Sequence, residues 1–229
     1  MKYGEIVELG RHRLMCGDAT KASDIELLAG SEQIDLILTD PPYGMKCQNK
    51  DGAIGGSKRL NNKSRITEIF KNGRVRTRDC IIHVHERAQM QGDDSSDTAK
   101  KFYNNVREFN ATKIIWGGQY FADFLPISGA WIFWDKNMPE KCSFSAGELA
   151  WCSKGKKVRK YKHQWSGCFK AGSYTLNPKP ALHPTQKPVE LHAHILEDFS
   201  KENDIVLDCF GGSGTTLIAC EITNRKCLM

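Results

Sequence analysis

Short apolar runs, separated by turns of polar and glycine residues, divide the chain into predicted strands and helices. Residues 5–9 and 12–16 predict two short strands around Gly10-Arg11, and a third apolar run begins at Ile34 and ends at Asp40. Further strands are predicted at residues 113–116, 130–134, 148–152 and 205–207. Because helical segments alternate with these strands through short connections, the pattern predicts an α/β fold with a doubly wound mixed sheet.

The predicted helices lie between these strands. Residues 23–28 predict the first helix, with Ser23 as N-cap and Glu26 at the capping-box position. Residues 97–109 predict the second, because its apolar positions recur at helical spacing. The remaining helices are predicted at residues 119–125, at residues 189–200 and from Thr215 onward.

Length and composition indicate a single domain, residues 1–229, without a membrane segment. The hydrophobic content of 40% is sufficient for a core. No apolar run approaches the roughly 20 residues that a membrane-spanning helix needs. The nine cysteines form no CxxC pair, a pattern typical of reduced thiols in a cytoplasmic protein.

The positive charge is concentrated in two segments. Residues 44–92 carry a surplus of seven positive charges and residues 154–180 a surplus of eight, so the rest of the chain has a net charge of −9. The second segment interleaves its basic residues with aromatic ones, as nucleic-acid-binding segments do. The alternative is two solvated loops whose charge bias has no binding role. Residues 44–92 show no clear periodicity and predict a flexible insertion that extends to residue 97.

The strand that ends at Asp40 is followed by Pro41, Pro42 and Tyr43. The two prolines stop the strand and stiffen the turn, at the sheet edge where ligands bind in open α/β folds. A carboxylate and a proline carbonyl can accept both hydrogens of an exocyclic amine, and the Tyr43 ring can cover a flat base. The alternative is a solvated aspartate beside a packed tyrosine.

A second motif follows the strand at residues 205–207. Asp208 lies at the strand end, and a glycine-rich turn at residues 211–214 leads into the helix from Thr215. This arrangement brings the backbone close to a nucleoside ligand. It is not a phosphate-binding P-loop, because no lysine follows the last glycine.

Two weaker signals accompany these motifs. Residues 183–188, His-Pro-Thr-Gln-Lys-Pro, precede a helix, where Thr185 and Gln186 either face a carboxylate ligand or simply cap the helix. Asp18 follows the second predicted strand, where it either faces a ligand or forms a turn.

Together these motifs resemble the amino-group DNA methyltransferases that use S-adenosylmethionine, in the order of their β group, with the catalytic motif before the cofactor loop. The resemblance implies a class I methyltransferase fold with residues 137–180 as target-recognition region. It implies catalytic roles for Asp40, Pro41, Pro42 and Tyr43. It implies cofactor contacts for Asp18, Thr185, Lys187, Asp208, Phe210, Gly211, Gly212, Ser213, Gly214 and Thr215.

The resemblance also implies a substrate, double-stranded DNA, and a target, the exocyclic amine of a flipped base. Asp rather than Ser before Pro-Pro-Tyr favours adenine N6 over cytosine N4 in this family. No metal is expected, and the sequence leaves a homodimer open. In the family an acidic residue on the strand after the glycine-loop helix holds the ribose; the sequence stops at residues 226–229, where that strand should begin.

Several alternatives stay open at this point. A C5-cytosine methyltransferase needs a cysteine after proline, and the chain contains no Pro-Cys pair. An RNA or protein-amide methyltransferase can use a similar Pro-Pro-Tyr turn. The remaining alternative is not an enzyme: it is a module that binds DNA but does not catalyse a reaction, because it lacks the C-terminal strand.

Overall fold

A computed structural model describes residues 1–45, 63–69, 75–81, 95–138, 145–166, 169–170 and 186–229. Most of the segment at residues 44–97 therefore lies outside the described residues, as do residues 139–144, 167–168 and 171–180 of the segment at residues 137–180. None of the described helices is long and apolar enough to cross a bilayer.

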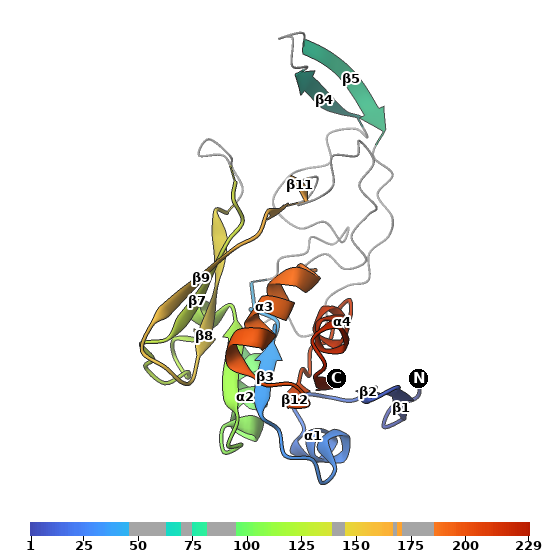
Figure 1. Ribbon diagram of the computed structural model, residues 1–229, viewed down its shortest axis with the longest axis vertical. Helices are drawn as coiled ribbons and strands as arrows, with labels where there is room; N and C mark the ends of the chain where they lie inside the picture. Colours follow the sequence, from blue (N-terminus) through green and yellow to red (C-terminus); the bar gives the residue numbers. More distant parts are fainter. Residues whose placement is uncertain (46–62, 70–74, 82–94, 139–144, 167–168, 171–185) are drawn as a thin grey trace.

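One nine-stranded mixed sheet organises the described residues (Figure 1). Its strands in spatial order are β1 (Ile6–Leu9), β2 (His12–Met15), β13 (Lys226–Leu228), β12 (Ile205–Leu207), β3 (Leu36–Thr39), β6 (Thr112–Trp116), β8 (Gly147–Cys152), β7 (Trp131–Asp135) and β9 (Val158–Lys162). The strands from β2 to β6 run parallel, whereas β1 and β8 are antiparallel to their neighbours. The predicted mixed sheet is confirmed.

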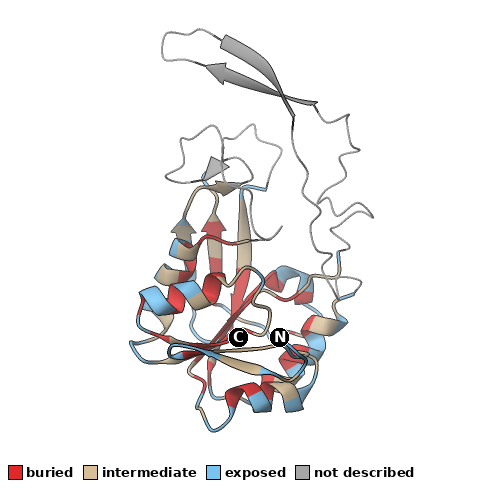
Figure 2. Cartoon of the chain, turned by 90° about the vertical axis from the view of Figure 1, so that its right-hand side faces the viewer, coloured by how far each residue is buried: buried red, intermediate tan, exposed pale blue. Residues whose placement is uncertain are grey.

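Helices cover both faces of the sheet, as a doubly wound fold requires. Helices α3 (Val189–Phe199) and α4 (Thr215–Ile222) pack on one face, and α1 (Ala22–Ala29) and α2 (Asp97–Val106) on the other. Strand β3 serves both cores: Leu36 and Leu38 face α3 and α4, and Ile37 faces α1 and α2. The fully buried centre of the sheet is therefore an apolar run between two helical layers (Figure 2).

Three local predictions need correction. Lys21, not Ser23, occupies the N-cap of α1, and the Ser23 hydroxyl donates to the neighbouring Asp24 carboxylate instead. The predicted helix at residues 119–125 is a short 3₁₀ turn, η1 (Gly118–Phe121), which begins after Gly117 in a left-handed conformation. The insertion contains an antiparallel pair, β4 (Lys63–Ile69) and β5 (Val75–Ile81), although the sequence shows no clear periodicity there.

The last predicted departure is also corrected. Residues 226–228 do form a strand, β13, which pairs in parallel with both β12 and β2. The strand that was expected to be missing is therefore present between β2 and β12, and the non-catalytic alternative loses that premise. None of residues 226–229 is acidic, however, so this strand does not carry the ribose-holding acidic residue of the family.

The basic segment at residues 154–180 contributes a strand to the main sheet. Strand β9 pairs in parallel with β7 at the edge. Arg159 and Tyr161 fix it to helix α3, because both side chains donate to the Asp198 carboxylate, at 3.0 and 2.5 Å. A further short pair, β10 (Trp165–Ser166) with β11 (Phe169–Lys170), follows. The start of the basic segment is therefore part of the same sheet as β3, the strand that leads to Asp40.

Helix α1 allows a direct test of this core. Leu28 is 4% exposed and packs under the sheet, whereas the adjacent Leu27 is 54% exposed. Leu28→Ala should lower the free energy of unfolding by about 2–5 kcal/mol, through lost burial and the cavity left behind. Leu27→Ala is the matched control and should change it by less than about 0.5 kcal/mol. Urea unfolding measures both, and equal effects would contradict the described packing of α1.

Candidate functional site

The two sequence motifs meet at one edge of the sheet. Strands β3 and β12 are parallel neighbours, with Leu36 opposite Val206 and Ile37 opposite Leu207. Asp40 and Asp208 therefore both follow the carboxyl ends of adjacent strands. The Thr39 hydroxyl donates to the Asp208 carboxylate at 2.7 Å and joins the two strand ends directly. The motif predicted to be catalytic and the motif predicted to bind the cofactor thus share the edge at which ligands bind in open α/β sheets.

Asp40 lies in the turn after β3, and both of its carboxylate oxygens have partners. The Tyr43 hydroxyl donates to Oδ1 at 2.5 Å, and the Lys187 ammonium donates to Oδ2. The carboxylate remains 21% exposed, and each carboxylate oxygen has two lone pairs. Asp40 therefore keeps acceptor capacity toward an incoming donor. Pro41 behind it is buried.

The ring of Tyr43 is held in place by its surroundings. Gly117 approaches it so closely that a Cβ there would lie 2.2 Å from the ring, and its φ of +70° also favours glycine. Tyr120, 42% exposed, stacks on Tyr43 with ring centroids 5.1 Å apart. Burial, and then the Asp40 carboxylate, raise the pKa of Tyr43 well above its usual value, so the hydroxyl stays a donor.

Lys187 links the turn after β3 to helix α4, which follows the glycine turn. Its side chain is 5% exposed, and its ammonium contacts Asp40, the Glu148 carboxylate at 3.4 Å and the face of Trp116 at 5.1 Å. Its carbonyl accepts a hydrogen bond from the Thr215 hydroxyl at 3.2 Å. Burial alone would lower the pKa of Lys187, but the two carboxylates outweigh it and raise the pKa. The lysine is therefore charged.

Asp208 is a buried acceptor at the start of the glycine turn. Besides Thr39, it accepts hydrogen bonds from the Thr216 hydroxyl at 2.6 Å and from the Phe210 backbone at 3.0 Å. Burial raises its pKa, and these three donors act in the opposite direction. Because the single Thr216 hydrogen goes to Asp208, the His192 Nδ1, 3.1 Å from that hydroxyl, must be the donor there.

The glycine turn has the backbone that its sequence predicts. Gly212 and Gly214 have φ angles of +53° and +76°, a region that glycine adopts without strain. The Gly214 amide donates to the Gly211 carbonyl at 2.8 Å and closes the turn. Gly214 is also the N-cap of α4. At Gly211, a Cβ would meet the Met229 sulfur at 2.4 Å, so a larger residue there would require the Met229 side chain to shift.

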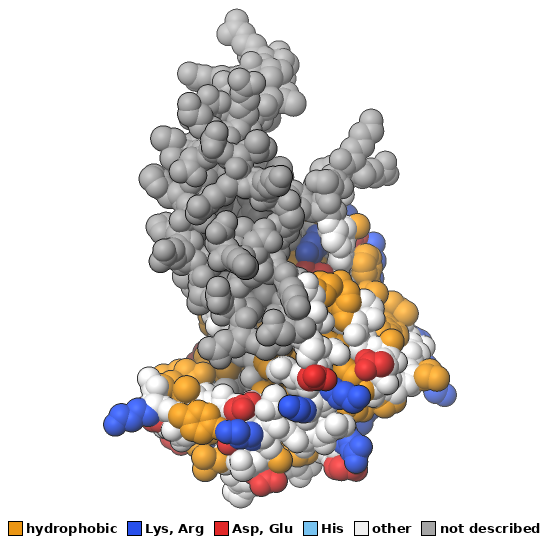
Figure 3. Space-filling model, turned by 180° about the vertical axis from the view of Figure 1, so that it is seen from behind, with side chains coloured by type: hydrophobic (Ala, Val, Ile, Leu, Met, Phe, Trp, Pro, Cys, Tyr) orange, Lys and Arg blue, Asp and Glu red, His pale blue; other side chains and the backbone are white. Residues whose placement is uncertain are grey.

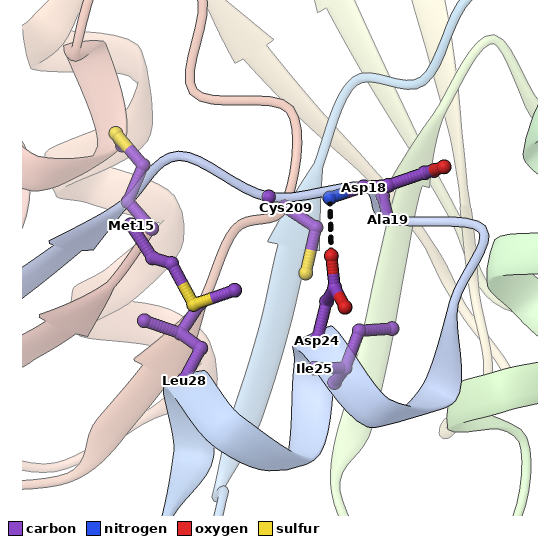
Figure 4. Close-up of a pocket in the computed structure, with 9 residues that line it drawn as sticks. Met15, Asp18, Ala19, Asp24, Ile25, Leu28 and Cys209 are labelled. Carbon is purple, nitrogen blue, oxygen red and sulfur yellow. Dashed lines mark hydrogen bonds between the residues drawn. The ribbon is translucent and has the colours of Figure 1, made fainter. Parts of the chain in front are cut away.

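A small pocket, about 40 Å³ in volume, lies beside the glycine turn, between β2, α1 and residue 209. Its lining combines apolar side chains with the Asp18 and Asp24 carboxylates (Figure 4). The Asp18 backbone amide donates to Asp24 at 2.9 Å, and the Asp18 carboxylate accepts from Thr20. The two hydrogen bonds from Thr20 lower the pKa of Asp18. Asp18 therefore both forms a turn and borders the pocket.

The structure brings most of the predicted site residues together. Hydrogen bonds and ion pairs connect Asp40, Tyr43 and Lys187, and Thr39 links them to Asp208. Asp18 follows β2, which β13 and β12 separate from β3, and it lines the pocket with Cys209 and Met229. Thr185 lies outside the described residues. Lys187, which was predicted to contact the cofactor, contacts Asp40, and the sequence did not indicate this contact. No group of three or more potential metal ligands occurs among the described residues.

Sequence reasoning missed four residues that support the site: Thr39, Glu148, His192 and Thr216. Glu148 had a recognisable signal, because it is the only charged residue in the strand Gly147–Cys152. Thr39 lies directly before the aspartate in an otherwise apolar run. His192 had none, because its contact depends on helices α3 and α4 packing side by side. Thr216 ends the glycine-turn motif directly after Thr215, and that position was its signal.

The sequence model of a protein family described as DNA methylase matches residues 34–229. This chain belongs to the DNA methylase family. Two relatives of this DNA methylase align along most of the chain. They are the putative methylase YubD of Escherichia coli K12, 26% identical over 207 residues, and the type II methyltransferase M.HinfI of Haemophilus influenzae, 24% identical over 219 residues.

The alignments cover different shares of these proteins. They span 84% of the chain and 74% of YubD, and 86% of the chain and 58% of M.HinfI. M.HpaI, a type II methyltransferase of Haemophilus parainfluenzae, is 51% identical over only 50 residues, which are 22% of the chain and 15% of that protein.

Solved structures of methyltransferases resemble this DNA methylase over most of its length. The M1.HpyAVI–SAM complex has a TM-score of 0.48 and 24% identity, covering 92% of this chain and 88% of that one. The cytosine-N4-specific PvuII DNA methyltransferase has a TM-score of 0.49 and 16% identity, covering 89% and 77%.

The buried histidine of this methylase predicts a pH-dependent loss of stability. Burial, and then the Lys187 charge, lower the pKa of His192 from 6.5 to about 3. The unfolded chain takes up this proton near pH 6.5 and the folded chain does not, so folding is unaffected above that pH and increasingly penalised below it. Between about pH 7.5 and about pH 5 this group should lower the free energy of unfolding by about 2 kcal/mol.

Urea unfolding of the His192→Gln variant at these two pH values measures that contribution. The variant should lose about 2 kcal/mol less than the unaltered protein between them. His194→Gln is the matched control, since His194 is exposed on the same helix. A His192→Gln variant with the pH dependence of the unaltered protein would contradict the neutral buried imidazole.

Proposed function

We propose that this chain transfers a methyl group from S-adenosylmethionine to the exocyclic amine of a flipped base in double-stranded DNA, at a specific site and with adenine N6 as the target. The observation that supports the proposal most is the connection between the two motifs at the sheet edge. Thr39 bridges their strands, and Lys187 contacts Asp40 through its ammonium and Thr215 through its carbonyl. Asp40, which can accept hydrogen bonds from an amine, is therefore linked to a glycine turn of the kind that suits a nucleoside ligand.

The catalytic task is to make a poor nucleophile reactive. The lone pair of an exocyclic amine is delocalised into the ring, so two acceptors that engage both of its hydrogens favour a pyramidal, more nucleophilic nitrogen. Asp40 and the Pro41 carbonyl have the chemistry for this task. The Tyr43–Tyr120 pair offers an aromatic surface to a planar base. No step in this scheme requires a metal.

The pocket beside residues 209 and 229 has a lining that suits the adenosine end of the cofactor. Ile25, Leu28 and Met15 provide apolar walls for a purine, and Asp18 and Asp24 provide acceptors for its amine. At about 40 Å³ it holds a few waters, so Met229, which packs on Gly211, would have to move for a purine to enter. When bound, the cofactor supplies an electrophilic methyl on a sulfonium.

Positive charge at the start of the recognition segment supports the choice of DNA. Lys154, Lys156, Lys157, Lys160 and Lys162 are exposed along or just before strand β9. On the face drawn in Figure 3, by contrast, basic and acidic side chains of the described residues are interspersed. Lys160 also pairs with the Asp135 carboxylate at 2.8 Å. A row of exposed lysines along a strand edge suits phosphate contacts, which position a protein on DNA without reading its sequence.

Labelled S-adenosylmethionine and unmodified plasmid DNA, followed by nucleoside analysis, test the function. The unaltered protein should yield N6-methyladenine; N4-methylcytosine would instead support the cytosine alternative. Asp40→Ala should lower the rate by about a hundredfold or more, because it removes the amine acceptor. Asp123→Ala, an exposed aspartate after η1, is the control and should match the unaltered protein. Calorimetric absence of cofactor binding would leave only a DNA-binding module and refute the enzyme.

Salt dependence of DNA affinity tests the phosphate contacts separately. Log affinity should fall linearly with log salt concentration, and changing Lys156 and Lys157 to Gln should reduce that slope by about 1 for each lysine. The double Lys→Arg variant keeps both charges and should keep the slope. Filter binding at several salt concentrations measures it, and an unchanged slope in the Gln variant would exclude phosphate contacts by these lysines.

A further inference from the structure

The charge cluster behind Asp40 extends further than the catalytic motif. Asp40, Lys187, Glu148 and Lys136 alternate in sign, with Lys187 to Glu148 at 3.4 Å and Glu148 to Lys136 at 2.6 Å. We propose that Glu148, supported by Lys136, is a positioning residue for methyl transfer, because it fixes the ammonium that orients the Asp40 carboxylate. The inference rests on the proposed function, to which it adds Glu148 from β8 and Lys136, the residue directly after β7.

The first step of the argument concerns the donors of Lys187. An ammonium has three N–H donors and no acceptor. Asp40 takes one and Glu148 takes another, while the Trp116 ring lies beneath at 5.1 Å. Three contacts therefore define the position of this nitrogen, one with the turn after β3, one with β6 and one with β8. Without Glu148, only Asp40 would remain as an anionic partner.

The second step concerns what Asp40 must keep free. Its oxygens already accept from Tyr43 and from Lys187, so the remaining lone pairs are the ones available to the target amine. An ammonium held by Asp40 alone could contact that carboxylate from other angles. Glu148 restrains it on the far side and thereby preserves the orientation of the free lone pairs.

The third step concerns the role of Lys136. Glu148 is partly buried, and burial alone would raise its pKa, but Lys187 and then Lys136 lower it. Lys136 also lies over the Trp134 ring at 4.9 Å, which limits its own movement. The four charges sum to zero, so the cluster needs no counterion. Lys136 thus keeps Glu148 ionised and directed toward Lys187.

Single-turnover methyl transfer by the Glu148→Gln variant tests the inference. The variant is nearly isosteric but has lost the charge that restrains Lys187. Its transfer rate should fall between about tenfold and a hundredfold, since small misplacements at a reacting centre have effects of that order. Cofactor affinity by calorimetry should change by less than about twofold. Glu197→Gln, an exposed glutamate on α3, is the matched control and should change neither quantity.

A double-variant cycle shows whether Glu148 acts through Lys187. If it does, Glu148→Gln combined with Lys187→Met should be no slower than Lys187→Met alone, because the intermediary is already gone. Independent, multiplicative effects would overturn the inference. Lys136→Met should slow transfer in the same direction but by a smaller factor, and it provides a second test if Glu148→Gln does not fold.

The outcomes separate this inference from the proposed function. If the unaltered protein does not methylate DNA, the proposed function fails. If it methylates and Glu148→Gln transfers equally fast per folded molecule, the positioning role fails while the function stands. A Glu148→Gln variant that is only less stable to urea, with an unchanged transfer rate, likewise assigns Glu148 a purely structural role.

Discussion

The whole site depends on one ammonium, that of Lys187, which is held out of water between two carboxylates. A lysine that is 5% exposed is tolerated only where its charge is compensated, and here Asp40, Glu148 and the Trp116 face provide the compensation. Because these partners come from β6, from β8 and from the turn after β3, the lysine also fixes that turn relative to the two strands. The segment before α3 is thereby joined to the turn that contains Asp40.

The parallel order of β12 and β3 determines the remainder of the arrangement. Parallel neighbours end at the same edge, so an aspartate after each strand is brought close without any special contact. Thr39 and Thr216 then connect the two ends through Asp208. The buried carboxylate is supported entirely by neutral donors, whereas Asp40 is paired with a cation. Two aspartates at equivalent positions therefore have different electrostatic surroundings and suit different tasks.

Sequence alone revealed the parts of this site whose signals are local. Asp40 and Asp208 were identified because a strand, a turn and glycine or proline residues follow one another along the chain. Glu148 was missed because its partners, Lys136 and Lys187, are brought to it only by pairing of β7 with β8 and by packing of the segment before α3. The Ser23 cap failed for the opposite reason: a correct local spacing was overridden where the chain enters α1 at Lys21.

Strand β13 has a consequence for how the molecule assembles. The hairpin of β1 and β2 adds to the main sheet only through β13, which lies between β2 and β12. Residues near the beginning of the sequence therefore join their sheet through partners some two hundred positions away. Contacts of such high sequence separation form slowly, since a long loop must close first. During synthesis on a ribosome, the β1–β2 hairpin would emerge long before β13, so the edge of β2 that pairs with β13 would remain unpaired until then.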